Sequence, residues 1–164
     1  MKSILSAICI SVVAWSYSAF GATPAMSRPI KEPCWVTIEA SSTTEKRYWN
    51  VIVQTKNLNT GERRLLGVYS FGRAQDPMKY APQKVRLSEL DNPTQIEIYW
   101  KDNTDINGPV SDLDGTKWNQ AIRFDQNLNS KGFPTHIYAT FWDREDDKSA
   151  EIHKVTLDFD YSQL

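Results

Sequence analysis

The residues from Asn103 to Asp114 read N-T-D-I-N-G-P-V-S-D-L-D and have the oxygen spacing of a loop that surrounds a calcium ion. Calcium takes about six to eight oxygen ligands, and a twelve-residue loop supplies them from positions 1, 3, 5, 7, 9 and 12, with glycine at position 6. Gly108 stands at position 6 and Pro109 offers its backbone carbonyl at position 7. The side chains that would bind the metal are those of Asn103, Asp105, Asn107, Ser111 and Asp114.

Two departures from this pattern favour a solvated turn. Asn103 lacks the charge that a carboxylate would supply, and Asp114 is shorter than the glutamate that binds calcium through both oxygens. The flanking helices of an EF-hand are missing, and Asn107-Gly108-Pro109 is an ordinary turn sequence. We therefore expect no cofactor, and we keep a calcium ion in this loop as the alternative.

A second candidate site combines aromatic and acidic residues at the ends of two predicted strands. I-Y-W-K-D-N-T-D (98–105) is similar to T-F-W-D-R-E-D-D (140–147), because an aromatic pair precedes an acidic cluster in both. If the two strands end on the same side of the domain, the acids form one rim beside two tryptophans. Aromatic anchors with a charged rim are typical of recognition surfaces, although core tryptophans and solvated loop tips would give the same pattern. The predicted binding residues are Trp100, Asp102, Asp105, Trp142, Asp143, Glu145, Asp146 and Asp147.

Signatures of catalysis are scarce, and we do not expect an enzyme. The two histidines, His136 and His153, stand in separate predicted strands. The sequence contains no H-E-x-x-H zinc motif, no G-x-S-x-G nucleophile motif and no glycine-rich phosphate loop. A small secreted hydrolase, whose triad would assemble from distant positions, is the weaker alternative.

The first 22 residues are interpreted as a signal peptide. Lys2 precedes an apolar run that extends through Trp15, and small residues follow at Ala19, Gly21 and Ala22. The run is shorter than the ~20 residues that cross a bilayer, so we expect cleavage near residue 22, a secreted or periplasmic location and no membrane insertion of the mature chain.

Cleavage would remove Cys9 and leave Cys34 as the lone cysteine. A lone cysteine cannot form an internal disulfide, and a buried apolar role is the first expectation for it. An intermolecular disulfide or a reactive thiol is the alternative.

The net charge excludes nucleic acid as a partner. The 19 basic and 20 acidic residues give a formal net charge of −1, and the sequence has no basic stripe for nucleic acid.

Alternating polarity predicts an all-β chain. Residues 23–33 are expected to form an extended N-terminal arm, and residues 34–164 a single β-sandwich domain. About eight short strands, separated by turns rich in asparagine, glycine and proline, predict two antiparallel sheets in an immunoglobulin-like or jelly-roll-like arrangement. The predicted strands cover residues 34–40, 47–55, 64–71, 84–90, 94–100, 121–125, 136–142 and 151–161.

The register of the last two strands follows from their apolar residues. Pairing Ile137 with Leu157 and Phe141 with His153 puts the apolar side chains on one face and places His136 on the other. In the first predicted hairpin, Arg63 and its neighbours are expected to solvate an edge strand.

The function expected from these features is that of an exported soluble protein that binds a protein partner through strand-end loops, as an inhibitor, immunity protein or effector does. The alternative is a carbohydrate-binding module with a structural calcium ion. That alternative requires an exposed row of tryptophans drawn from Trp35, Trp49, Trp100, Trp118 and Trp142.

Overall fold

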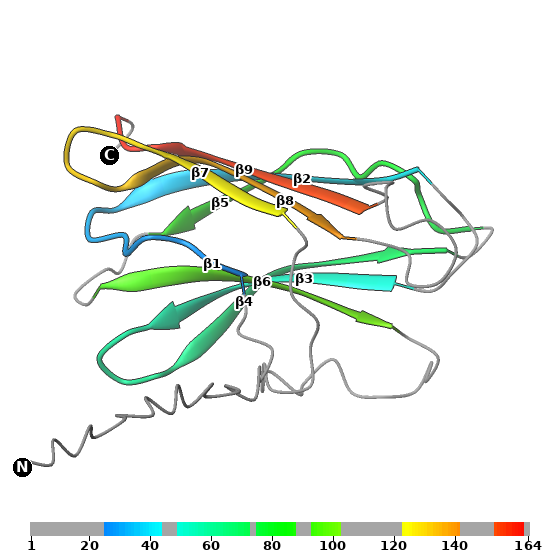
Figure 1. Cartoon of the computed structure of the whole chain (residues 1–164), viewed down its shortest axis with the longest axis horizontal. Helices are drawn as coiled ribbons and strands as arrows, with labels where there is room; N and C mark the ends of the chain where they lie inside the picture. The colour runs from blue at the N-terminus through cyan, green and yellow to red at the C-terminus, as the bar shows by residue number, and fades with distance from the viewer. Residues whose placement is uncertain are drawn as a thin grey trace, which may run out of the picture.

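The computed structural model of the protein describes residues 25–43, 49–72, 75–87, 93–102, 123–141 and 153–162, with the backbone alone for Trp49 and residues 100–102. These residues form two antiparallel β-sheets packed against each other, which confirms the predicted β-sandwich. Figure 1 shows the sheets as two layers. The predicted signal peptide, the loop from Asn103 to Asp114 and the cluster at residues 142–147 lie outside the described residues.

The two sheets are here called sheet A, with strand order β1-β6-β3-β4, and sheet B, with strand order β5-β2-β9-β8-β7. Sheet A contains β1 (Ala25–Met26), β3 (Trp49–Asn57), β4 (Arg63–Phe71) and β6 (Thr94–Asp102). Sheet B contains β2 (Cys34–Ser42), β5 (Gln83–Leu87), β7 (Arg123–Leu128), β8 (Pro134–Phe141) and β9 (His153–Asp160). The short strand β1 was not predicted; it lies in the expected N-terminal arm and pairs with β6, with Ala25 opposite Ile98.

The core lies between the sheets, and alternation along the strands builds the sheet B side of it most regularly in β2 and β9. Strand β2 buries every second residue, from Cys34 to Ser42, and β9 does the same from His153 to Phe159. Strand β8 pairs with β9 as predicted, with Ile137 opposite Leu157 and Phe141 opposite His153. Each large apolar side chain buried in this way stabilises the fold by about 1.5–3 kcal/mol.

Side-chain contacts close the sandwich at both edges. On one side, the backbone N–H of Arg28, which follows β1, donates to Gln126 Oε1 of β7 over 2.9 Å. On the other side, Tyr69 Oη of β4 donates to Gln83 Oε1 of β5 over 3.0 Å. Each edge of one sheet is therefore tied to an edge of the other.

Cys34 is fully buried at the start of β2. Burial, together with the negative charge of Asp160, raises the pKa of its thiol to about 12. The thiolate is the nucleophilic form of cysteine, so this thiol is inert at neutral pH. The expected role as a small buried apolar side chain is confirmed.

The outer face of sheet A carries a buried carboxylate. Glu97 of β6 is 0% exposed, and its Oε2 accepts hydrogen bonds from Gln54 Nε2 at 2.8 Å and Arg63 Nε at 2.9 Å. Lys56 Nζ lies 3.9 Å from the other oxygen, Oε1. Burial and the nearby Glu97 carboxylate raise the pKa of Tyr99. The expectation that Arg63 only solvates an edge strand is wrong, because its guanidinium neutralises a buried acid.

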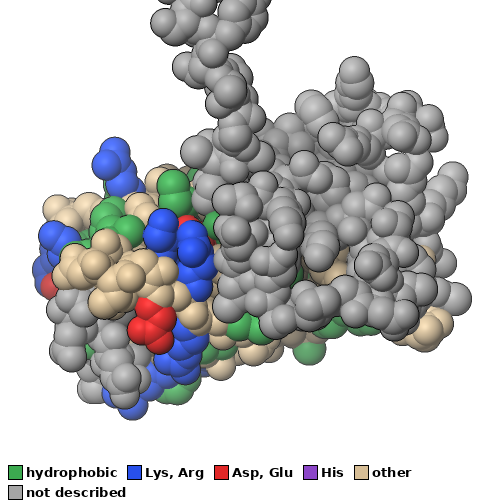
Figure 2. All heavy atoms as spheres, turned by 90° about the horizontal axis from the view of Figure 1, so that it is seen from below, with side chains coloured by type: hydrophobic (Ala, Val, Ile, Leu, Met, Phe, Trp, Pro, Cys, Tyr) green, Lys and Arg blue, Asp and Glu red, His purple; other side chains and the backbone are tan. Residues whose placement is uncertain are grey.

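Lys and Arg side chains gather on this side of the molecule at the end that carries the turn between β3 and β4 (Figure 2). Arg64 is exposed there, next to Arg63. The two arginines are adjacent in sequence but differ in their contacts, which makes them a matched pair for mutation.

Replacing Arg63 with methionine is expected to lower the free energy of unfolding by about 2–3 kcal/mol, because a buried carboxylate loses its main counter-charge. The side chain of Arg63 is 28% exposed, so this figure is below the ~3–5 kcal/mol typical of fully buried pairs. Urea denaturation measures the change. Arg64→Met should change the free energy by less than about 0.5 kcal/mol, and equal effects of the two substitutions would contradict the assignment.

His153 is a second buried ionisable group. It is 0% exposed at the start of β9, and its ring stacks on Phe71 of β4 with 5.5 Å between centroids. Burial lowers its pKa from 6.5 to about 4, because the charged imidazolium loses its hydration. The folded protein therefore holds His153 neutral, whereas the unfolded chain takes up a proton below pH 6.5.

This difference predicts a loss of stability in acid. The contribution of neutral His153 is fully present above about pH 6.5 and is lost as the pH falls from 6.5 toward 4, for a total of about 2–3 kcal/mol by pH 4.5. We expect His153→Phe to flatten the stability profile between pH 7 and 4.5. Replacement of the half-exposed His136 with glutamine is the control. Chemical denaturation across this range tests the prediction, and parallel profiles for the wild type and His153→Phe would disprove it.

Candidate functional site

The outer face of sheet B is the candidate site, because it presents polar and aromatic side chains instead of burying them. The same alternation that turns Val36 and Leu157 inward turns the intervening residues outward. Strand register then sets them in rows across the sheet. The half-buried or exposed residues of this face include Trp35, Thr37, Glu39, Ser41, Lys84, Arg86, His136, Tyr138, Lys154, Thr156, Asp158 and Asp160.

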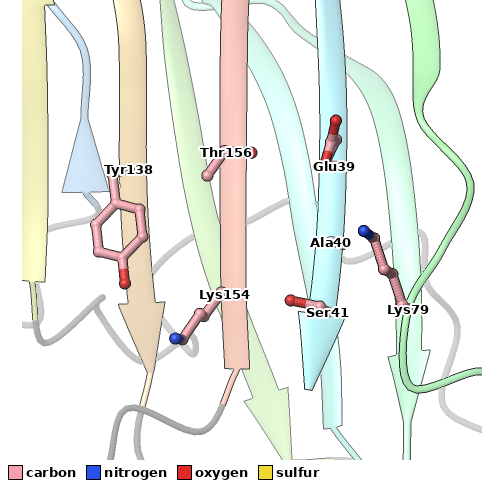
Figure 3. Close-up of a pocket in the computed structure, with 7 residues that line it drawn as sticks. All are labelled: Glu39, Ala40, Ser41, Lys79, Tyr138, Lys154 and Thr156. Carbon is pink, nitrogen blue, oxygen red and sulfur yellow. The ribbon is translucent and has the colours of Figure 1, made fainter. Parts of the chain in front are cut away.

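A hollow of about 180 Å³ opens on this face where β2, β9 and β8 run side by side. Figure 3 shows the Tyr138 hydroxyl and the Lys154 ammonium pointing toward one another, with the Ser41 hydroxyl directed at the same space from β2. The lining residues are Glu39, Ala40, Ser41, Lys79, Tyr138, Lys154 and Thr156.

Two rows of the sheet supply most of the lining. Thr156 of β9 lies between Glu39 of β2 and Tyr138 of β8. In the next row, Lys154 of β9 lies opposite Ser41 of β2. Because all of these residues belong to paired strands, their spacing is fixed by the backbone hydrogen bonds of the sheet.

Lys79 reaches the hollow from outside the regular strands. The segment around it pairs with the end of β2, through Ser42 N to Met78 O at 2.7 Å and Tyr80 N to Ala40 O at 2.9 Å. Tyr80 anchors this segment to sheet A, because its hydroxyl donates to Ser70 O at 2.8 Å and accepts from Ser70 N at 3.0 Å.

The charged groups of the hollow have no ionic partner among the described residues. Lys79, Lys154 and Glu39 form no ion pair within 4.0 Å in that part of the chain. Elsewhere on the same sheet Arg123 pairs with Asp125, and His136 Nδ1 lies 2.7 Å from Asp158 Oδ1. The hollow thus carries charges that no described residue neutralises.

Trp35 lies on the same face, near the opposite end of β2. Lys84 Nζ lies 5.0 Å from the centre of its ring and Arg86 Cζ lies 6.0 Å away, both within the range of cation–π attraction. Hydrogen bonds from Ser162, and the nearby Lys84, lower the pKa of Asp160, which pairs with Trp35 across the sheet. This end of the face is also charged at neutral pH.

The predicted strand-end site is described only in its backbone. Trp100 lies opposite Val51, and Asp102, the last residue of β6, lies opposite Trp49. The ends of β6 and β8 lie at the same end of the sandwich, because Trp49 also pairs with Phe71, which stacks on His153. Figure 1 shows both strands running toward that end. The geometric condition for one acidic rim is therefore met by the strand ends, while Asp105, Trp142, Asp143, Glu145, Asp146 and Asp147 fall outside the described residues.

Sequence reasoning did not single out the hollow. The alternation H-K-V-T-L-D in β9 places Lys154 and Thr156 on the polar face. The outward position of these two residues could therefore be predicted from the sequence. The position of Lys79 depends on a loop segment that pairs with β2, and no local pattern in the loop predicts this contact.

Neither histidine lines the hollow, because His153 is in the core and His136 is paired with Asp158. Within the described ranges, no group of three or more His, Cys, Asp or Glu residues is arranged to hold a metal ion. No helix in that same part of the chain is long and apolar enough to cross a membrane. Of the five tryptophans that follow the predicted signal peptide, only Trp35 has a described side chain.

The fold and the hollow define an antiparallel β-sandwich with a polar, aromatic-bearing face on one sheet. Comparisons of the chain with protein families, with curated proteins and with solved structures found no match in any of the three.

Tyr80→Phe tests how Lys79 is held in place. The substitution removes both hydrogen bonds to Ser70, so we expect a loss of about 1–3 kcal/mol of unfolding free energy and faster hydrogen exchange at the Ser42 and Tyr80 amides. Tyr161→Phe is the matched control, because its hydroxyl donates to Pro134 O at the other end of the sheet. Hydrogen-exchange mass spectrometry or NMR measures the effect. Unchanged protection at Ser42 and Tyr80 in the Tyr80→Phe variant would contradict this anchoring role.

Proposed function

We propose that the protein is exported and works by binding a protein partner, and that the outer face of sheet B forms part of the binding surface. The observation that carries the proposal is the hollow, whose two lysines and one glutamate have no ionic partner among the described residues. Polar groups in a receptor are commonly left unmatched where a ligand supplies the missing charges. The proposal includes no cofactor.

The size of the hollow supports a macromolecular partner over a small substrate. Pockets for small molecules and cofactors usually enclose about 300–1,000 Å³. A volume of about 180 Å³ is smaller, and the face around it is open. A space of this size suits one side chain of a larger partner that lies across the sheet.

The aromatic residues on the face supply the second requirement of a binding surface. Trp35 and Tyr138 are both half-buried on this face, with Lys84 and Arg86 over the Trp35 ring and Arg123 over the Tyr138 ring. Tryptophan and tyrosine contribute a large share of binding energy in protein interfaces, often about 2 kcal/mol or more for one residue. The predicted binding residues at 142–147 follow β8 in the chain, and β8 ends next to the row that carries Lys154.

Affinity capture with matched variants tests the proposed function. Protein without residues 1–22 is immobilised, treated with extract and medium of the producing cell, and the bound proteins are identified by mass spectrometry. The affinity of each candidate for the wild type and the variants is then measured by calorimetry. We expect a partner whose affinity falls about 30-fold with Tyr138→Ala, because the ring lies beside the hollow.

Leu58→Ala is the control, because Leu58 is an exposed apolar residue at 39% in the turn between β3 and β4. It should leave the affinity unchanged. A protein partner that binds all variants equally would remove the outer face of sheet B from the surface. Specific capture by oligosaccharides, with no protein partner, would favour the carbohydrate-binding alternative.

A further inference from the structure

The groups that line the hollow are mainly hydrogen-bond donors. The ammonium groups of Lys79 and Lys154 donate and cannot accept, and the hydroxyls of Ser41 and Thr156 form no hydrogen bond with any other described residue. Among the described lining residues, Glu39 is the one acid. A ligand that satisfies this set must therefore offer acceptors and negative charge.

The arrangement of these donors selects a compact anion. Ser41 and Lys154 are opposite one another on paired strands, and Tyr138 is on the strand beyond. Figure 3 shows the Lys154 ammonium turned toward the Tyr138 hydroxyl and the Ser41 hydroxyl pointing toward β9 from β2, with Lys79 on the other side of β2. A carboxylate has two oxygens and about four acceptor sites, so it can accept from an ammonium and a hydroxyl at the same time.

The backbone positions of these donors are set before binding. Lys154 is paired on both sides, with Ser41 of β2 and Thr140 of β8, and the segment of Lys79 is held by the backbone hydrogen bonds that flank it. A preorganised receptor loses less conformational entropy when the ligand arrives. The hollow therefore has a fixed backbone frame, from which the two lysine side chains extend.

We propose that the hollow binds the carboxylate of an aspartate or glutamate side chain on the protein partner. This inference rests on the proposed function and adds the chemistry of one contact to it. Lys154, Ser41 and Tyr138 would surround the carboxylate, and Lys79 would add a second positive charge. Glu39 would meet a donor on the partner, next to the bound acid.

The test uses a hexaglutamate peptide as a probe and ¹⁵N-labelled protein. We expect the peptide to shift the amide signals of Ser41, Lys79 and Lys154, with an affinity that decreases as salt is raised. Lys154→Gln and Lys79→Gln should each weaken binding about 3- to 10-fold, and Glu39→Gln should strengthen it about 3-fold.

Lys131→Gln is the control, because Lys131 is an exposed lysine that pairs with Glu32 outside the hollow. It should not change the affinity. Equal weakening by Lys131→Gln would show general charge attraction and overturn the inference, as would the absence of shifts at the hollow. Shifts at the hollow with trigalacturonate but not with hexaglutamate would assign it to acidic sugars and also overturn it.

The inference and the proposed function can fail separately. A captured partner that loses affinity with Tyr138→Ala but not with Lys154→Gln would support the binding face and reject the carboxylate contact. Specific hexaglutamate binding at the hollow without any captured partner would support the anion site and reject the proposed function.

Discussion

The register of β9 between β2 and β8 is the constraint on which the rest of the structure depends. In this register, Val155 and Leu157 of β9 meet Ala40 and Ile38 of β2 in the core. A slip of one residue would turn Lys154 and Thr156 inward and expose the apolar residues, at a cost of about 1.5–3 kcal/mol for each large side chain. The apolar residues thus fix the position of the polar ones, and the hollow is a consequence of how the core packs.

Lys79 depends on the core in a different way. Its segment is held on one side by pairing with the end of β2 and on the other by the hydrogen bonds of Tyr80 to Ser70 in sheet A. The ring of Tyr80 also makes edge contacts with Tyr69 and Phe71 at centroid distances of 5.1 and 5.5 Å. The hollow on the outer face of sheet B is therefore completed by a segment that contacts both sheets, which couples the stability of one edge to the shape of the hollow.

The sequence predicted the parts of the fold that local patterns determine. Alternation gave the sandwich and placed most strands within a few residues, and the apolar set of the last hairpin gave its exact register. The sequence did not predict β1, because a strand of two residues shows no alternation of polarity. It also did not predict the ion pair between Arg63 of β4 and Glu97 of β6. The contact between Lys79 and Ser41 could not be predicted either. The two residues are distant in the chain, and pairing at that distance depends on the whole fold.

The buried carboxylate on sheet A and the lysines of the hollow on sheet B differ in what the fold requires of them. On sheet A, Glu97 is fully buried and matched by Arg63 and Gln54, because an unmatched buried carboxylate would destabilise the fold by several kcal/mol. On sheet B, Lys79 is exposed and Lys154 is half-exposed, so water solvates both ammonium groups and the fold does not require a partner for them. Exposed charges that stability does not demand can serve recognition without weakening the protein. A ligand that displaces water from the two ammonium groups would have to supply the negative charge that no described residue provides.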